Sequence, residues 1–186
     1  MGIRVEEKNL VEIEAKLNEM QTELNKIVYL ESALKEDLTY EVKRFIWEML
    51  AELYESQKMY EKAAKAIQNR TGVDISFKEK VEGYLHAGEL YAKAGKVDDA
   101  ESMFLKAFGN ADNQQKLRIK LAMKNIFLIS AQELERKGKE LAALKYYERL
   151  IKMPLDEIEK KEIKDKLITL YRRLGRFKDA KLVEGI

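Results

Sequence analysis

The stretch YLHAGELYAKAGKVDDAESMFLKA at residues 84–107 has the pattern of two short helices joined by a tight turn. Gly95 is placed to end the first helix, because glycine readily adopts the positive φ that such a turn requires. Ala100 follows one turn into the second helix, where a small side chain lets two helix backbones approach closely. The stretch therefore predicts a helical hairpin.

The same turn recurs along the chain. A turn residue and an alanine five residues later occur at Lys58 and Ala63, Gly95 and Ala100, Gly138 and Ala143, and Gly175 and Ala180. The four alanines are 37, 43 and 37 residues apart, a period typical of arrays of helix pairs. Such hairpins bury their apolar faces only by stacking on one another.

Helix starts are marked by a short polar residue with an acid or amide three positions later, at Ser76, Asp112 and Asp156. Pro154 cannot continue the preceding helix. We expect first helices at about 38–56, 77–94, 113–137 and 157–174, and second helices at about 59–70, 97–109, 140–152 and 177–184. The four hairpins then span about 38–73, 76–110, 112–153 and 156–186.

The segment 1–36 predicts one long helix, at about residues 6–35. Its apolar residues recur in steps of three and four: Leu10, Ile13, Leu17, Met20, Leu24, Ile27 and Leu34. This spacing suits a coiled-coil seam. A helix that caps the first hairpin is the favoured alternative, because Val11, Val28 and Leu30 widen the apolar stripe beyond a narrow seam.

At the other end, the short last helix has apolar residues without a following helix to cover them: Phe177, Leu182, Val183 and Ile186. A contact between copies of the chain, or with a partner, would bury them.

Composition supports an all-α protein, with 46% apolar and 37% charged residues, one proline and nine glycines. There is no cysteine, and His86 is the only histidine, so the usual metal sites and nucleophilic triads lack their residues. No glycine-rich phosphate loop occurs. We expect no enzyme activity and no cofactor, a cytoplasmic location and no membrane insertion. Abundant Lys and Glu also resemble a thermophile composition.

The formal net charge of +2 argues against general binding of nucleic acid. The charge is unevenly distributed, with a net −4 over residues 1–75 and +6 over residues 76–186. Residues 114–152 hold ten basic and four acidic side chains, which leaves RNA binding open as an alternative.

The chain from about residue 38 resembles the tetratricopeptide repeat family. The best copy has Tyr84, Gly88, Tyr91, Gly95, Ala100, Phe104 and Ala107 at the family spacing. The first copy has Trp47, Leu50, Ala51, Tyr54, Tyr60, Ala63 and Ile67; the third has Phe127, Ala131, Gly138, Ala143 and Tyr147; the fourth has Leu167, Tyr171, Gly175, Phe177 and Ala180. In the fourth copy Lys164 replaces the leading aromatic residue of the family pattern. The repeat periods of 37 and 43 residues also exceed the family's 34, which implies that the first helices are extended.

The resemblance implies a right-handed α-solenoid that binds a peptide or helix of another protein on the concave face of its first helices. On this sequence that face comprises Phe45, Glu48, Glu52, Glu55, Glu82, Leu85, Glu89, Lys93, Asn125, Leu128, Gln132, Arg136, Asp165, Thr169, Arg172 and Arg173. Family members that bind a C-terminal carboxylate hold it with a clamp of Lys and Asn, whereas the corresponding part of this chain has Glu48 and Glu52, which disfavours such a ligand.

The predicted face is acidic toward its first helices and basic toward its last, which would favour a partner segment of opposite charge polarity. The expected function is therefore a non-enzymatic protein-binding scaffold. Two alternatives are a subunit that assembles with itself through its N-terminal helix and uncovered C-terminal helix, and an RNA-binding repeat.

Overall fold

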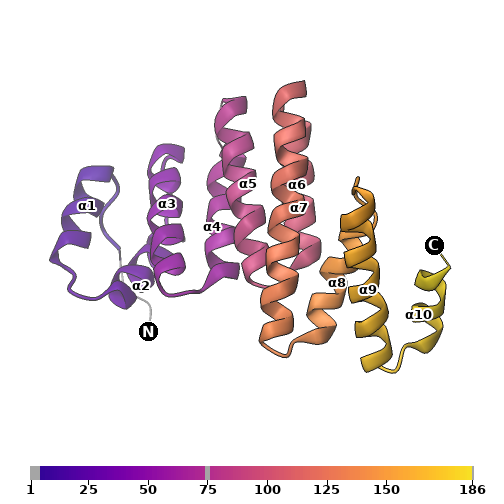
Figure 1. Cartoon of the computed structure of the whole chain (residues 1–186). Coiled ribbons are helices and arrows are strands. Elements are labelled where there is room, and N and C mark those ends of the chain that lie inside the picture. The colour runs from indigo at the N-terminus through magenta and orange to yellow at the C-terminus, as the bar shows by residue number, and fades with distance from the viewer. Residues whose placement is uncertain (1–4, 74–75, 186) are drawn as a thin grey trace.

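The computed structural model describes residues 5–73 and 76–185, and over these residues it is all-helical, with ten helices and no strand. The helices are α1 (Leu10–Glu19), α2 (Glu23–Ala33), α3 (Tyr40–Ser56), α4 (Tyr60–Val73), α5 (Phe77–Lys93), α6 (Val97–Gly109), α7 (Asn113–Arg136), α8 (Glu140–Leu150), α9 (Glu157–Arg173) and α10 (Phe177–Glu184). Figure 1 shows them following one another as an elongated array. The eight helices expected from residue 38 onward are present, with ends within about three residues of those predicted.

Successive hairpins place their first helices beside one another and their second helices beside one another. In the row of first helices, Glu55 of α3 contacts His86 of α5 at 3.4 Å. Farther along this row, Glu135 of α7 pairs with Lys166 of α9 at 3.1 Å. In the row of second helices, Arg149 of α8 reaches Glu101 of α6 at 2.8 Å.

The predicted turns have the expected backbone. Gly95, Gly138 and Gly175 adopt φ of 76°, 70° and 72°, and Lys58 adopts φ of 58° in the turn that lacks glycine. In each turn the next residue donates its amide to the carbonyl five positions earlier, as Lys96 does to Tyr91 at 2.9 Å. The four alanines that follow the turns are buried.

Two of the three predicted capping boxes are complete. The side chains of Asp112 and Asp156 accept the backbone N–H of Gln115 and Glu159, respectively. In return, the side chains of Gln115 and Glu159 accept the backbone N–H of the two aspartates. Ser76 also accepts the Glu79 backbone N–H, at 3.1 Å.

The first three hairpins are each closed by a small residue packed opposite a large one. A β-carbon on Gly88 would lie 2.9 Å from the ring of Phe104, so glycine is needed for these helices to approach. Ala51 and Ala131 take the same place in their own hairpins, facing positions that hold Ile67 and Tyr147, and all four are buried. A continuous core thus runs along the array.

The N-terminal segment is two helices, so the prediction of one long helix at 6–35 is wrong. Its residues 1–4 lie outside the described residues. Met20 is extended at ψ 125°, and Thr22 caps α2 by accepting the Asn25 backbone N–H. A new helix start at Thr22 leaves no continuous seam for a coiled coil. Ile13 and Leu30 are instead buried in the core that α3 shares.

Helix α2 stands in the place of a second helix that precedes α3. The Tyr54 hydroxyl on α3 donates to Glu31 on α2, 23 residues earlier. The same separation recurs where Tyr91 donates to Gln68 at 3.0 Å and where Tyr171 donates to Glu148 at 2.8 Å. The stacking therefore extends at least one helix further toward the N-terminus than the turn pattern predicted.

Helix α7 interrupts this regularity. Its position equivalent to these tyrosines is Leu134, which has no hydroxyl. Helices α3, α5 and α9 each have 17 residues, whereas α7 has 24. The predicted extension of the first helices is therefore confined to α7. In Figure 1 its first turns project beyond α8 and α9.

Replacing Lys58 with glycine is expected to stabilise the fold by about 0.5–1 kcal/mol. A residue with a β-carbon loses about 1–2 kcal/mol at positive φ, and the extra freedom of glycine in the unfolded chain offsets part of this gain. Urea unfolding followed by circular dichroism measures the difference. The matched control is Gly95→Ala, which places a β-carbon at φ 76° and should lower stability by about 1 kcal/mol. A stability loss in Lys58→Gly would contradict this account.

The tyrosine bonds predict a loss of stability at alkaline pH. Burial and the bond to Glu148 raise the pKa of Tyr171 to about 12. Burial and the bond to Glu31 also raise the pKa of Tyr54. An unfolded tyrosine ionises near pH 10, so above about pH 10 the unfolded chain binds fewer protons, and stability falls as pH rises.

The urea midpoints of the native chain and of a Tyr54→Phe/Tyr171→Phe variant, measured at pH 8 and pH 11, test this loss. The drop between the two pH values should be smaller in the variant, because phenylalanine has no proton to release. Equal drops in both proteins would assign the alkaline loss to other groups.

Candidate binding surface

One stripe of each first helix stays open to solvent. In α3, α5, α7 and α9 it occupies four positions in steps of four, three and four residues. We call these the first-helix face: Phe45, Met49, Glu52, Ser56, Glu82, His86, Glu89, Lys93, Asn125, Ile129, Gln132, Arg136, Glu162, Lys166, Thr169 and Arg173. All are exposed or half-buried, while the opposite sides of the helices are buried.

The structure places ten of the sixteen predicted residues on this face: Phe45, Glu52, Glu82, Glu89, Lys93, Asn125, Gln132, Arg136, Thr169 and Arg173. The other six, Glu48, Glu55, Leu85, Leu128, Asp165 and Arg172, lie beside the stripe. The sequence prediction missed six residues of the stripe: Met49, Ser56, His86, Ile129, Glu162 and Lys166. All but Glu162 follow four residues after another position on the stripe.

Several of the predicted charges are used inside the chain. Glu48 pairs with Arg70 of α4 at 3.2 Å, and Arg70 is only 17% exposed. Arg172 pairs with Glu184, while Leu85 packs against the core. The acidic-to-basic polarity is therefore weaker than predicted. Glu52, Glu82 and Arg136 remain without an ion pair among residues 5–73 and 76–185.

A cleft separates α5 from α7 on the first-helix face. Its walls include Ala92, Ile126 and Leu134, and its empty volume is about 490 Å³. Ile129 borders it and is 57% exposed. A salt bridge stands on each side, Lys93 with Glu89 at 2.9 Å and Lys137 with Glu133 at 3.3 Å. The cleft is thus an apolar slot with a charged rim.

Partial burial acts to lower the pKa of Lys93, but the carboxylates of Glu89 and Glu55 outweigh it and hold that pKa above its usual value. Lys93 therefore stays cationic at the rim of the cleft.

A second cleft lies between α1 and α3, with an empty volume of about 630 Å³. Leu17, Phe45, Met49 and Leu53 give it apolar walls, and Glu14, Asn18 and Lys26 complete it. Met49 and Leu53 occupy the positions that Ile129 and Glu133 occupy in α7. The two clefts are therefore the same inter-helix position in different hairpins.

Between α3 and α5 this position is filled. His86 stands where Met49 and Ile129 stand, and its Nε2 lies 3.4 Å from Glu55. The only histidine in the sequence thus has one carboxylate beside it. In the part of the chain that the structure describes, no group of three or more His, Asp and Glu residues could hold a metal ion.

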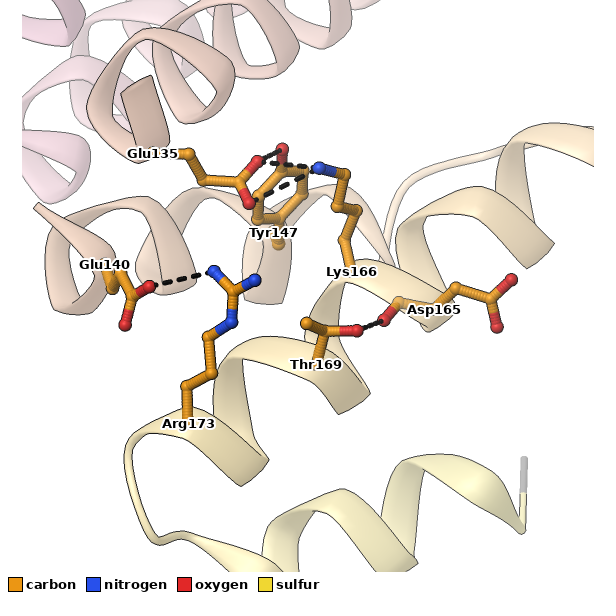
Figure 2. A network of polar contacts seen from close by, with 7 residues as sticks. All are labelled: Glu135, Glu140, Tyr147, Asp165, Lys166, Thr169 and Arg173. Carbon is orange, nitrogen blue, oxygen red and sulfur yellow. Dashed lines mark hydrogen bonds and ion pairs between the residues drawn. The ribbon is translucent and has the colours of Figure 1, made fainter. Parts of the chain in front are cut away.

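Toward the C-terminus the face is occupied by internal contacts. Figure 2 shows Glu135 accepting hydrogen bonds from the Tyr147 hydroxyl and from Lys166, at 2.7 and 3.1 Å, which ties α7 to α8 and α9. Arg173 pairs with Glu140 at 3.0 Å, and the Thr169 hydroxyl donates to the Asp165 carbonyl at 2.8 Å. The open part of the face is therefore the part on α3, α5 and α7.

Comparison of the sequence with models of known protein families and with curated proteins finds no match. None of the helices in the described ranges has the length and apolar content needed to cross a membrane.

The ion pairs predict that Glu48 and Glu52 differ in their effect on stability, although they lie four residues apart on α3. Glu48→Lys leaves the half-buried Arg70 beside a like charge and should cost about 1–3 kcal/mol. Glu52→Lys, at an open position, should change stability by less than about 0.5 kcal/mol. Thermal or urea unfolding of the two variants gives both values. Equal losses would show that the Arg70 contact does not stabilise the fold.

Proposed function

We propose that this protein is a non-enzymatic interaction scaffold of the tetratricopeptide-repeat type, whose hairpins stack as a right-handed superhelix. Its partner is a peptide or helical segment of another protein, which lies across the first-helix face from α3 to α7. The turn spacing and the small residues between paired helices support the repeat type. A cytoplasmic location is part of the proposal.

The observation that carries this proposal is the pair of equivalent clefts on one face. Each has apolar walls and a charged or polar border, the arrangement that accepts a partner's apolar side chain and orients the segment around it. Met49 and Ile129 occupy the same helix position in their hairpins, so one bound segment could use both clefts as anchors.

Two other functions remain less supported. Self-assembly was suggested by the apolar seam of the N-terminal helix and by the uncovered end of α10. The seam is interrupted at Met20, while Phe177 and Leu182 are exposed and Ile186 lies outside the described residues. RNA binding rests on the basic composition of residues 114–152.

Capture of partners from source lysate on the immobilised full chain tests the scaffold function. A protein held by the native chain should be reduced at least tenfold by a Met49→Glu/Ile129→Glu variant, because the new carboxylates would be buried on binding. The matched control is Leu141→Glu, which changes a leucine on α8 that is exposed as much as Ile129 (60% against 57%) and should retain the partner.

Equal capture by the native chain, the double variant and the control would show that the two clefts are not the binding site for the partner. Recovery of further copies of this chain alone would favour self-assembly, and recovery of RNA would favour the third function. Reversal of the open glutamates, Glu52→Lys and Glu82→Lys, should weaken the complex several-fold and change its salt dependence if the acidic end of the face contacts the partner.

A further inference from the structure

The extension of α7 creates a second exposed surface, which continues from the first-helix face beyond Asn125 onto the first half of the helix. Asp112 caps this helix early, so α7 begins about two turns before the equivalent point of its neighbours. Helix α8 has 11 residues against 24 in α7 and therefore lies beside only its second half. We call Lys116, Leu117, Lys120 and Leu121, on the first half, the α7 ledge.

One side of this half-helix is anchored. Ile119 is buried with Val81 of α5 and Ala107 of α6. The Phe108 ring lies under Lys116 and Lys120, whose ammonium nitrogens are 5.3 and 5.4 Å from its centroid. The ledge is therefore held firmly on its inner side while its outer side is open.

The open side combines aliphatic and basic residues. Leu117 and Leu121, one turn apart, are 62% and 48% exposed. Lys116, Arg118 and Lys120 have no ion pair among the residues that the structure describes. No acidic residue occurs between Asn113 and Gln132, whereas α3, α5 and α9 each have acids in their first turn.

The leucines continue into a cleft between α7 and α9. Leu128, two turns beyond Leu121, borders it together with Leu155 and Ile163, and its empty volume is about 330 Å³. Two acids border the cleft. Glu159 is paired with Lys124 across it, at 2.5 Å, and Glu162 lies on its α9 side, away from the three cations in the first half of α7. Leu117, Leu121 and Leu128 thus lie along one side of α7, with the polar Lys124 and Asn125 between the last two.

We propose that the α7 ledge is a docking site for an acidic amphipathic helix of a partner protein. Leucine, isoleucine or aromatic residues of that helix, one turn apart, would cover Leu117 and Leu121 and reach the cleft at Leu128. Glutamate or aspartate beside them would pair with Lys116, Arg118 and Lys120. This site is independent of the clefts on the first-helix face.

The observations favour a protein over nucleic acid. Binding of single strands relies on aromatic rings that stack with bases. The apolar residues of the ledge are leucines, and the ring that its lysines touch, Phe108, is already covered by two ammonium groups.

The probe is a displayed library of randomised 20-residue helical peptides, selected on the immobilised full chain. Selected peptides should be acidic, with apolar residues one turn apart. Their affinity should fall at least tenfold for Leu117→Gln/Leu121→Gln, which removes apolar surface without loss of helix propensity, and for Lys116→Glu/Lys120→Glu. Circular dichroism verifies that both variants fold, as expected for exposed positions.

The other outcomes would contradict the proposal that the α7 ledge is a docking site. These are no enrichment, enrichment of basic peptides, or peptides that bind both ledge variants like the native chain. Peptides lost only by Met49→Glu/Ile129→Glu would refute the ledge and leave the scaffold function standing. In parallel, we would measure binding of a fluorescent 20-nucleotide single-stranded RNA to the native chain and to both ledge variants. Binding that is kept in Leu117→Gln/Leu121→Gln and lost in Lys116→Glu/Lys120→Glu would contradict a protein partner and show that the ledge binds nucleic acid.

Discussion

A hydrogen bond from the tyrosine hydroxyl of a first helix to the preceding second helix joins the stacked helices at three of the four junctions in the array. It recurs at Tyr54, Tyr91 and Tyr171 with the same separation of 23 residues from its acceptor. Because each bond sets one first helix against the hairpin before it, the exposed stripes come into line. At α7 leucine replaces the tyrosine, and the overhanging helix occurs there.

Local signals predicted most of the helices and failed at one. Gly95 and its equivalents end helices through a backbone requirement that sequence displays directly. The N-terminal break does not show in the apolar spacing, since Leu17, Met20 and Leu24 keep steps of three and four across it. Thr22 was the signal, because a short hydroxyl residue begins α2 by capping it. Periodicity measures which residues share a face and is insensitive to an interruption of the helix axis.

The candidate surface was predictable in outline, because helical spacing identifies the stripe that neighbouring hairpins leave uncovered. Which of its charges are available was not predictable. Glu48 is bound by Arg70, 22 residues later, and Arg173 by Glu140, 33 residues earlier. Such pairs depend on how the two helices of one hairpin, or two neighbouring hairpins, are rotated against each other. The clefts at Met49 and Ile129 likewise arise from packing gaps between helices rather than from any local motif.

The constant separation of 23 residues also constrains how the length of this chain can change. An insertion or deletion between a second-helix acceptor and its tyrosine would shift the hydroxyl around or along its helix, away from its partner. Hairpin length is then fixed wherever the bond exists, at 37 residues from one turn to the next. Before Leu134 no such bond has to be kept, and there the period has lengthened to 43. The junction between α6 and α7 is thus the place in the array where added residues do least harm.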